Sequence, residues 1–420
     1  MMCILKNMRK LIVIGGGAAG MMAAVQAAEL GADVALLEKN EKLGKKLYIT
    51  GKGRCNVTNQ CDLQTFQRHV VRNPRFLFSA LQLLSPADLM EWFERHGCAL
   101  IVERGNRVFP ASQKASDITK ALERALEQLG VHIFRNTQVL RLLIEDGTVK
   151  GVITNRGSMR ADSVILATGG CSYPSTGSTG DGWKWLSEAG HQVNPARPSL
   201  TGLRSSERWV TDLQGVSLKN VTISVKRGKK EVFSELGEML FTHFGISGPL
   251  VLSASAYLAD CSFDDVTLAL DLKPGMTREQ LDVRIQRDIA QSPQKQLIHL
   301  LRGLFPQKVA ETICYLCGFN GQERGCDFQR VQRMKLIDNT KALRIPVAGL
   351  CSMEEAIVTC GGLCVKEVNP STMESKLVKN LYIAGELLDV DALTGGFNLQ
   401  IAFATGFTAG TSAAKALQWE

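Results

Sequence analysis

Residues 11–38 read LIVIGGGAAGMMAAVQAAELGADVALLE, and this stretch decides the fold class. An apolar run meets the turn Gly15–Gly20, an Ala-rich stretch of helical composition follows, and a second apolar run ends at Glu38. Strand, glycine turn, helix, strand and acid in this order are typical of the βαβ unit that binds a dinucleotide, with the acid on a ribose diol. The sequence therefore predicts a Rossmann-like α/β domain that binds a dinucleotide.

Each glycine of the turn is expected to have a different structural role in such a unit. Gly15 is expected to make the tight turn, Gly17 to let a pyrophosphate approach the backbone, and Gly20 to let the helix pack on the strand. The N–H groups at the start of the helix, on Ala18 and Ala19, would face the phosphates at the positive end of the helix dipole. A glycine-rich turn of another βαβ unit is the alternative, and the spacing of every part argues against it.

The bulk composition is that of an ordinary globular protein. The chain has 420 residues, of which 45% are apolar and 21% charged, and this length suggests two or three domains. No apolar run is long enough for a transmembrane helix, and residues 1–10 do not read as a secretory signal. We therefore expect a cytoplasmic protein that does not enter a membrane.

The 12 cysteines do not form a metal-binding pattern. Cys314 and Cys317 form one close pair and Cys360 and Cys364 another, but neither has a second pair or a histidine at zinc spacing. We expect free thiols in a reducing compartment and no metal site, with Cys314 and Cys317 buried in a helical core.

Composition along the chain predicts three parts. Residues 1–195 and 346–420 read as strands alternating with helices, and we expect them to form one discontinuous nucleotide-binding domain. Residues 196–272 and 338–345 are β-rich, and residues 273–337 carry helical patterns. An inserted β domain would thus carry an inserted helical piece.

Several local signals place turns and helix ends. Asp146-Gly147 predicts a hairpin turn, and Lys226–Lys230 predicts a basic hairpin tip. Thr277–Gln280 has the pattern of a capping box, residues 325–337 read as a helix, and an Ala/Gly-rich helix is expected over residues 397–414.

Three further motifs distinguish FAD from NAD. Ala167–Gly170 ends a strand that would close the cofactor crevice from the other side. Glu386 and Asp389 follow another buried strand, where a carboxylate can bind the ribityl hydroxyls of a flavin. Gly395–Gln400 opens a helix whose positive end would face the flavin pyrimidine. Each motif alone has an ordinary structural explanation, but together they resemble the two-part FAD site of glutathione-reductase-like flavoproteins.

A closer resemblance rests on four longer segments. Gly51–Asn59, reading GKGRCNVTN, looks like a motif of the BaiN/YhiN-like flavoproteins, some of which are called aminoacetone oxidases. Gly237–Pro249 is similar to a second segment of that family, Thr359–Gly362 followed by Thr372–Lys376 to a third, and Ala384–Gln400 to a fourth. Because these motifs span nearly the whole chain, the sequence is identified as a member of this family.

The resemblance implies an α/β fold with a discontinuous Rossmann-like FAD domain, a β-barrel-like insertion and a helical lid. Members of the family are linked to reduction of conjugated steroid alkenes, reduction of a uridine in ribosomal RNA, and oxidation of aminoacetone. The residues expected to hold FAD all lie in the motifs above or beside them: Gly15, Gly17, Ala18, Ala19, Gly20, Glu38, Lys39, Lys46, Gly53, Arg54, Cys55, Asn56, Thr168, Gly169, Gly385, Glu386, Asp389, Gly396, Asn398, Leu399 and Gln400.

A disulfide reductase mechanism is disfavoured. Such enzymes need two cysteines separated by four residues beside the flavin, whereas Cys55 and Cys61 are separated by five. They also carry a second glycine fingerprint for NAD(P)H, and residues 196–345 contain none. A nicotinamide donor would therefore bind transiently, without a Rossmann domain of its own.

We expect a reductase that passes hydride from NAD(P)H through flavin N5 to an activated C=C bond. The matching proton would come from His243, Cys55, Tyr173 or a water molecule, and the sequence does not rank these donors. For His243, the sequence alone favours a satisfied structural histidine over a proton donor.

The substrate is left open between a small molecule, such as a steroid enone, and RNA. Residues 273–344 contain 13 Lys and Arg and 7 Asp and Glu, a net charge of +6 within a total of +8. A solvated helical face is one interpretation of this excess, and contact with a nucleic acid is the other. The alternative functions are oxidation of aminoacetone and a non-catalytic, flavin-containing RNA-binding factor; the sequence indicates no oligomeric state.

Overall fold

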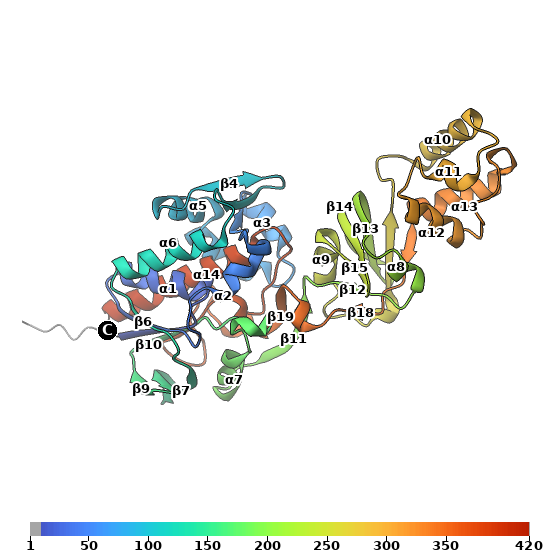
Figure 1. Ribbon diagram of the computed structural model, residues 1–420. Helices are drawn as coiled ribbons and strands as arrows, with labels where there is room; N and C mark the ends of the chain where they lie inside the picture. The colour runs from blue at the N-terminus through green and yellow to red at the C-terminus, as the bar shows by residue number, and fades with distance from the viewer. Residues whose placement is uncertain (1–9, 420) are drawn as a thin grey trace, which may run out of the picture. The chain divides into compact units, whose positions relative to one another are not determined.

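The computed structural model describes residues 10–419 and divides the chain into two compact units (Figure 1). The first unit comprises Met1–Ser199 and Met353–Glu420, and the second is Leu200–Ser352. Within the described residues, no helix combines the length and apolarity needed to cross a membrane. The expected α/β fold, with a discontinuous Rossmann-like domain and an inserted β and helical part, is confirmed.

A five-stranded parallel sheet is the centre of the first unit, in the order β20-β10-β1-β2-β6. The chain runs from β1 to β2 on one side and later adds β10 on the other side of β1, so a topological switch point lies between β1 and β10. Ligands of open α/β sheets bind outside the carboxyl ends of the strands at such a point. The strands are β1 (Lys10–Ile14), β2 (Asp33–Leu37), β6 (His132–Phe134), β10 (Ser163–Leu166) and β20 (Leu381–Ile383).

The two halves of the first unit are joined by close helix packing. Helix α1 (Ala18–Glu29) follows the glycine turn, and α14 (Phe397–Trp419) is the expected C-terminal helix. A Cβ on Gly406 of α14 would lie 2.2 Å from the backbone oxygen of Ala19, so a glycine is required at this crossing. Helix α6 (Ala115–Gln128) packs beside α1 (Figure 1).

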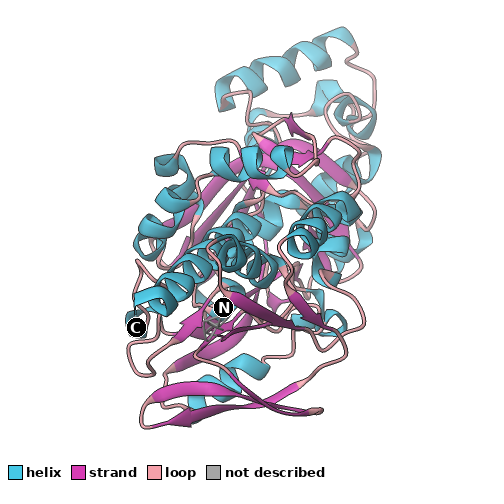
Figure 2. Cartoon of the chain, turned by 90° about the vertical axis from the view of Figure 1, so that its left-hand side faces the viewer, coloured by secondary structure: helices cyan, strands magenta, loops and turns pink. Residues whose placement is uncertain are grey.

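Three small antiparallel sheets complete the first unit (Figure 2). The Asp146-Gly147 turn joins β7 and β8, which confirms the predicted hairpin. The sheets consist of β3 (Thr58–Asn59), β5 (Arg107–Pro110) and β4 (Leu100–Glu103); β7 (Val139–Glu145), β8 (Thr148–Thr154) and β9 (Gly157–Arg160); and β11 (Val193–Ser199) with β19 (Val358–Leu363). The helices around them are α2 (Lys45–Ile49), α3 (Leu63–His69), α4 (Phe78–Leu83), α5 (Pro86–Arg95) and α7 (Asp181–Glu188).

The second unit contains a seven-stranded antiparallel sheet in the order β17-β16-β13-β14-β15-β12-β18. The two longest strands, β13 and β14, form a hairpin whose exposed tip is the predicted basic segment Lys226–Lys230. The elements are β12 (Leu203–Arg204), α8 (Arg208–Asp212), β13 (Ser217–Arg227), β14 (Lys230–Thr242), β15 (Gly245–Ser247), α9 (Pro249–Ala256), β16 (Val266–Asp271), β17 (Leu343–Ile345) and β18 (Gly349–Leu350).

Four helices, inserted between β16 and β17, share one hydrophobic core with this sheet. The predicted capping box at Thr277 starts the first of them. The helix expected over residues 325–337 begins only at Arg330 and continues to Lys341, because buried Phe328 precedes it in a separate turn and Thr340 is still buried. The helices are α10 (Arg278–Gln291), α11 (Leu297–Leu301), α12 (Gln307–Leu316) and α13 (Arg330–Lys341).

Candidate functional site

The glycine turn forms an open cradle at the carboxyl end of β1. A Cβ on Gly17 would meet no atom within 4 Å, whereas a Cβ on Gly20 would lie 1.8 Å from the backbone oxygen of Gly15. Gly17 caps α1 without a side-chain hydrogen bond, and the first turn of α1 holds no acidic residue. The first N–H groups of α1, including those of Ala18 and Ala19, lie at the positive end of the helix, next to the open space beside Gly17.

Glu38 lies beside this cradle at the end of β2 and is 8% exposed. One carboxylate oxygen accepts the backbone N–H of Gly16 at 2.8 Å, and the other accepts the backbone and side-chain N–H groups of Asn40 at 2.8 and 2.7 Å. The carboxylate is thus fixed in position. Because two carboxylate oxygens offer about four acceptor sites, capacity for a further donor is left.

Three buried oxygen atoms of the predicted site have no hydrogen-bond partner among the described residues: Asn56 Oδ1, Thr168 Oγ1 and Asp389 Oδ1. The second oxygen of Asp389 accepts the amide of Asn194 at 2.8 Å. Buried polar atoms in native proteins are normally paired, so each such atom calls for a ligand or water partner. Thr168 and Gly169 follow β10, and Asp389 follows β20. These atoms therefore mark the carboxyl side of the sheet as a place for a polar ligand.

Two motifs far apart in the sequence interlock here. Gly396 has φ 98°, and a Cβ on it would lie 2.3 Å from the backbone oxygen of Thr58, so only glycine fits. The Thr58 hydroxyl donates to Gln400 at 2.6 Å, and the Asn59 amide donates to the backbone oxygen of Gly395 at 3.1 Å. The GKGRCNVTN segment thus seats the start of α14.

Two residues expected to hold FAD have side chains that bond to other parts of the protein. The Gln400 amide donates to the backbone oxygen of Leu84 at 2.8 Å. The Asn398 amide accepts the N–H of Ala392 at 2.9 Å and donates to its oxygen at 2.8 Å. These side chains shape the loop before α14, and half-buried Leu399 packs against the core between them.

Replacement of Gln400 by leucine is expected to lower the free energy of unfolding by about 2–4 kcal/mol, because it leaves the Leu84 oxygen and the Thr58 hydroxyl unsatisfied in the core. Denaturant unfolding followed by circular dichroism measures the change. Gln418→Leu is the matched control, since its amide bonds the Leu30 oxygen at the exposed end of the same helix. A loss for Gln400→Leu no larger than that of the control would contradict this role.

The cations of the predicted site all have protein partners. Lys39 pairs with Asp181 at 2.7 Å, and Lys46 pairs with Glu386 at 2.6 Å. Arg54 bonds Glu103 and Gln113, and its guanidinium lies 4.2 Å from the centre of the Phe109 ring. Gly53, just before it, is exposed. Gly385, which follows β20, donates its N–H to Thr405 at 2.9 Å.

The three predicted proton donors lie in different surroundings. Cys55 is fully buried, and burial raises the pKa of its thiol to about 12. Tyr173 is half-buried in the loop after β10 and has a left-handed backbone, with φ 52°. His243 belongs to the second unit, where it is exposed at the turn between β14 and β15 and its ring centre lies 5.1 Å from that of Phe244. Only Cys55 and Tyr173 share the unit that carries the cradle.

The Cys55 thiol is expected to resist alkylation. Its raised pKa and full burial keep the reactive thiolate scarce at pH 8. After brief iodoacetamide treatment of the native protein, peptide mass spectrometry should find exposed Cys326 modified and Cys55 unmodified, with both modified after denaturation. Equal modification of the two in the native protein would refute this assignment.

A buried ion pair beside this site was not predicted from the sequence. Asp391 is fully buried, pairs with Arg72 at 2.7 Å and accepts the Ser199 hydroxyl at 2.7 Å. Burial raises the pKa of Asp391, and the adjacent Arg72 opposes that shift. The signal available was an acidic residue in an apolar run two positions after Asp389, but its partners lie far along the chain.

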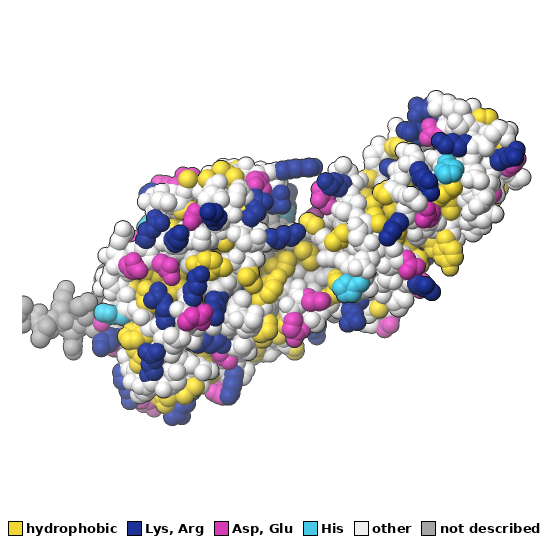
Figure 3. Space-filling model, in the orientation of Figure 1, with side chains coloured by type: hydrophobic (Ala, Val, Ile, Leu, Met, Phe, Trp, Pro, Cys, Tyr) yellow, Lys and Arg dark blue, Asp and Glu magenta, His cyan; other side chains and the backbone are white. Residues whose placement is uncertain are grey.

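The basic segment 273–344 is partly neutralised by its own carboxylates. Figure 3 shows Lys and Arg interspersed with Asp and Glu over the visible face of the helices, without one continuous basic patch. The ion pairs found within it or to the adjacent strand are Arg278–Asp338, Arg284–Asp288, Arg287–Asp288, Arg302–Glu311, Arg333–Asp282 and Lys341–Asp271.

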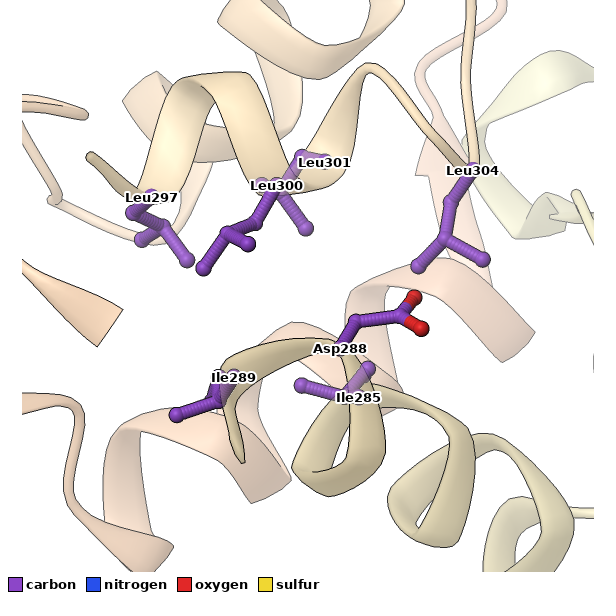
Figure 4. Close-up of a pocket in the computed structure, with 7 residues that line it drawn as sticks. All are labelled: Ile285, Asp288, Ile289, Leu297, Leu300, Leu301 and Leu304. Carbon is purple, nitrogen blue, oxygen red and sulfur yellow. The ribbon is translucent and has the colours of Figure 1, made fainter. Parts of the chain in front are cut away.

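A small apolar hollow lies between α10 and α11 (Figure 4). It encloses about 220 Å³ that is partly open to solvent, below the roughly 300–1,000 Å³ of ordinary ligand pockets. The Asp288 carboxylate at its edge bonds Arg284. This hollow is therefore no argument for a steroid site. No cluster of three His, Cys, Asp or Glu suited to a metal ion occurs among residues 10–419.

Comparison with known proteins identifies the family. The HI0933-like protein Rossmann domain family matches residues 9–412. The chain belongs to this HI0933-like family. A 3-dehydro-bile acid delta(4,6)-reductase of Clostridium scindens is 31% identical to the HI0933-like chain, over 97% of this chain and 100% of its own length. A ribosomal RNA dihydrouridine synthase of Haemophilus influenzae is also 31% identical, over 96% of this chain and 98% of its own length.

Solved structures agree on the fold. The 3-ketosteroid delta1-dehydrogenase from Sterolibacterium denitrificans matches with a TM-score of 0.51 and 15% identity, over 98% of this chain and 100% of that one. A flavocytochrome c3 fumarate reductase matches with a TM-score of 0.50 and 19% identity, over 97% and 78%. At these identities the likeness concerns the fold alone. This likeness confirms the Rossmann-like FAD-binding fold, and the family identifies the HI0933-like protein as an FAD-dependent oxidoreductase.

Proposed function

We propose that this HI0933-like protein is a reductase of an activated C=C bond. The observation that carries the proposal is that two full-length relatives, each 31% identical, are named for addition of hydrogen to a double bond. One name is a bile-acid reductase, and the other is a synthase of dihydrouridine, which is uridine with its ring C=C bond saturated. A shared reaction type with different substrates is the simplest account of that pair.

The residues of the first unit fit a bound FAD. The N–H groups of α1 behind Gly17 would hold the pyrophosphate, Glu38 the adenosine ribose, and Asp389 the ribityl hydroxyls. The unpartnered oxygens of Asn56 and Thr168 would receive hydrogen bonds from the cofactor or its bound water. When bound, FAD supplies the hydride for the substrate carbon. NAD(P)H is the proposed electron donor and binds transiently.

Tyr173 is our proposed proton donor. Cys55 is fully buried, whereas Tyr173 is half-buried in the loop after β10, next to the proposed flavin-binding edge. Its left-handed backbone is of the strained kind that clusters at functional sites. His243, which belongs to the second unit, is the second candidate.

Replacement of Tyr173 by phenylalanine is expected to lower kcat about 10²-fold, which is a common loss for a general acid, while FAD affinity stays unchanged. Steady-state kinetics and flavin titration test this. His243→Ala serves as the comparison and should change kcat less. The reverse order of effects would assign the proton to His243.

Uridine in RNA is the second candidate substrate beside a steroid enone. Tyr315 is 72% exposed at the end of α12, and exposed Lys308 lies two helical turns before it on the same helix. Exposed Lys335 on α13 has its Nζ near Gly318, whose N–H donates to the backbone oxygen of Tyr315 at 2.9 Å. An exposed aromatic ring with exposed lysines on its own helix and on α13 suits base stacking and phosphate contact.

We also propose a cytoplasmic location. The described cysteines form no disulfide, as is usual for proteins of a reducing compartment.

Product analysis tests the proposed reaction. The FAD-loaded protein is incubated without oxygen with NAD(P)H and either a dienone steroid or ribosomal RNA, and mass spectrometry measures the products. We expect one substrate to gain two hydrogen atoms. Consumption of aminoacetone with oxygen would establish the oxidase alternative, and RNA binding without any product would establish the non-catalytic one.

A further inference from the structure

Lys46 connects the carboxyl ends of the strands of the parallel sheet. It lies on α2, whose preceding residue Gly44 donates its N–H to the Gly16 oxygen in the glycine turn at 2.8 Å. Its Nζ donates to the Ser172 hydroxyl and to the Glu386 carboxylate, each at 2.6 Å. Ser172 follows β10 and Glu386 follows β20, so the ammonium group joins two strand ends, and the backbone bond of Gly44 adds the turn after β1.

The partners of Lys46 are themselves fixed. The second oxygen of Glu386 accepts the Thr359 N–H at 2.7 Å and the Ser172 hydroxyl at 3.1 Å. The Thr359 hydroxyl accepts the N–H groups of Cys171 and Ser172 at 2.9 and 3.0 Å. The ammonium position is therefore determined by a closed network. This network belongs wholly to the first unit.

The surroundings of Lys46 screen its positive charge less than water would. The side chains of Lys46 and Glu386 are 24% and 17% exposed; neighbouring Lys45 is 28% exposed, but its partner Glu41, at 2.9 Å, is 66% exposed, so the two pairs differ in the burial of the carboxylate. A half-buried charge is screened less than a surface one. An ammonium has three N–H donors, and within residues 10–419 two acceptors are found for that of Lys46. One donor is left for a ligand.

The topology indicates which half of a dinucleotide this donor serves. A dinucleotide lies across the switch point with its pyrophosphate at the glycine turn and its halves on either side. Glu38 ends β2 on one side, and Ser172 and Glu386 follow β10 and β20 on the other. The partners of Lys46 therefore mark the half remote from the adenosine ribose, which is the half that carries the flavin ring.

We propose that Lys46, held by Glu386 and Ser172, is the cation that raises the reduction potential of the bound FAD. This inference rests on the proposed function, because it assigns Lys46 to the flavin end of that site. Two-electron reduction adds negative charge to the flavin ring, and a nearby ammonium stabilises the reduced form more than the oxidised form. The network would then hold the charge in place through the catalytic cycle.

The test compares reduction potentials of the FAD-loaded variants. Lys46→Gln removes the charge but keeps an amide that can bond Ser172 and Glu386. We expect its preference for reduced over oxidised FAD to fall about tenfold, which lowers the potential by about 30 mV for a two-electron couple. Lys46→Arg keeps the charge and should keep the potential, and Lys45→Gln is the matched control on the same helix.

The alternative is that Lys46 is only a structural tie. That role predicts an unchanged potential in Lys46→Gln with normal FAD content and circular dichroism, and this result would overturn the proposal. If Lys46→Gln does not hold FAD, the reduction potential of Glu386→Gln tests the proposal in its place. Removal of the anion beside Lys46 should raise the reduction potential of the bound FAD, and an unchanged potential would contradict the proposal. Wild-type protein without FAD or without product would instead contradict the proposed function, before any variant is compared.

Discussion

Replacement of Gly20 by alanine is expected to abolish FAD retention and to lower the free energy of unfolding by about 3 kcal/mol. The added methyl group would lie 1.8 Å from the Gly15 backbone oxygen, so either α1 or the turn must move. Movement of either one changes the direction of the N–H groups in the cradle. Thermal unfolding and flavin absorbance of the purified variant measure both effects.

Gly17→Ala is the matched control within the same turn. Its methyl group would enter open space and change stability by no more than about 1 kcal/mol, the usual scale for a cap residue. It would nevertheless occupy the space assigned to the pyrophosphate and weaken FAD binding about tenfold or more, which is the value of one charged hydrogen bond. Normal FAD affinity in Gly17→Ala would show that the pyrophosphate does not bind in this cradle.

Replacement of Asp391 by alanine is expected to cost about 3–5 kcal/mol of stability. Asp391 is fully buried, and the substitution takes a carboxylate away from Arg72 and an acceptor from Ser199. The pair joins the segment after α3 to the loop that carries Asp389, where the Val71 N–H also donates to the backbone oxygen of Asp391 at 2.8 Å. Equilibrium urea unfolding measures the loss, and FAD content should fall with it.

The control is an ion pair of similar length on the surface. Arg160 and Glu145 are joined at 2.6 Å, but their side chains are 66% and 52% exposed. Glu145→Ala should change stability by less than about 1 kcal/mol, because an exposed pair is solvated and screened by salt. A loss for Asp391→Ala as small as this would show that burial of the pair has no energetic consequence.

The sequence was sufficient for the parts of the fold that depend on local pattern. The run from Leu11 to Glu38 specifies its own strands, turn and helix, since apolar periodicity and glycine positions act over a few residues. The hairpin at Asp146-Gly147 and the capping box at Thr277 are local in the same sense. Each of these predictions is confirmed.

The roles of individual side chains depended on partners remote in the sequence. Gln400 and Asn398 lie in the motif that resembles a flavin-binding helix start, yet their amides bond the backbone at Leu84 and Ala392. Asp391 is paired with Arg72, more than 300 positions away, and no pattern links the two. Spacing reveals which residues share a motif, whereas tertiary contacts decide which atoms stay available for a ligand.

Anaerobic rapid mixing tests the central claim most directly. The FAD-loaded protein is first reduced with NAD(P)H and then mixed with the dienone steroid, ribosomal RNA or dissolved oxygen while the visible flavin absorbance is followed. We predict that one C=C substrate restores the oxidised spectrum much faster than oxygen does, at a rate that accounts for turnover. Rapid reoxidation by oxygen together with no response to either C=C substrate would contradict the reductase account.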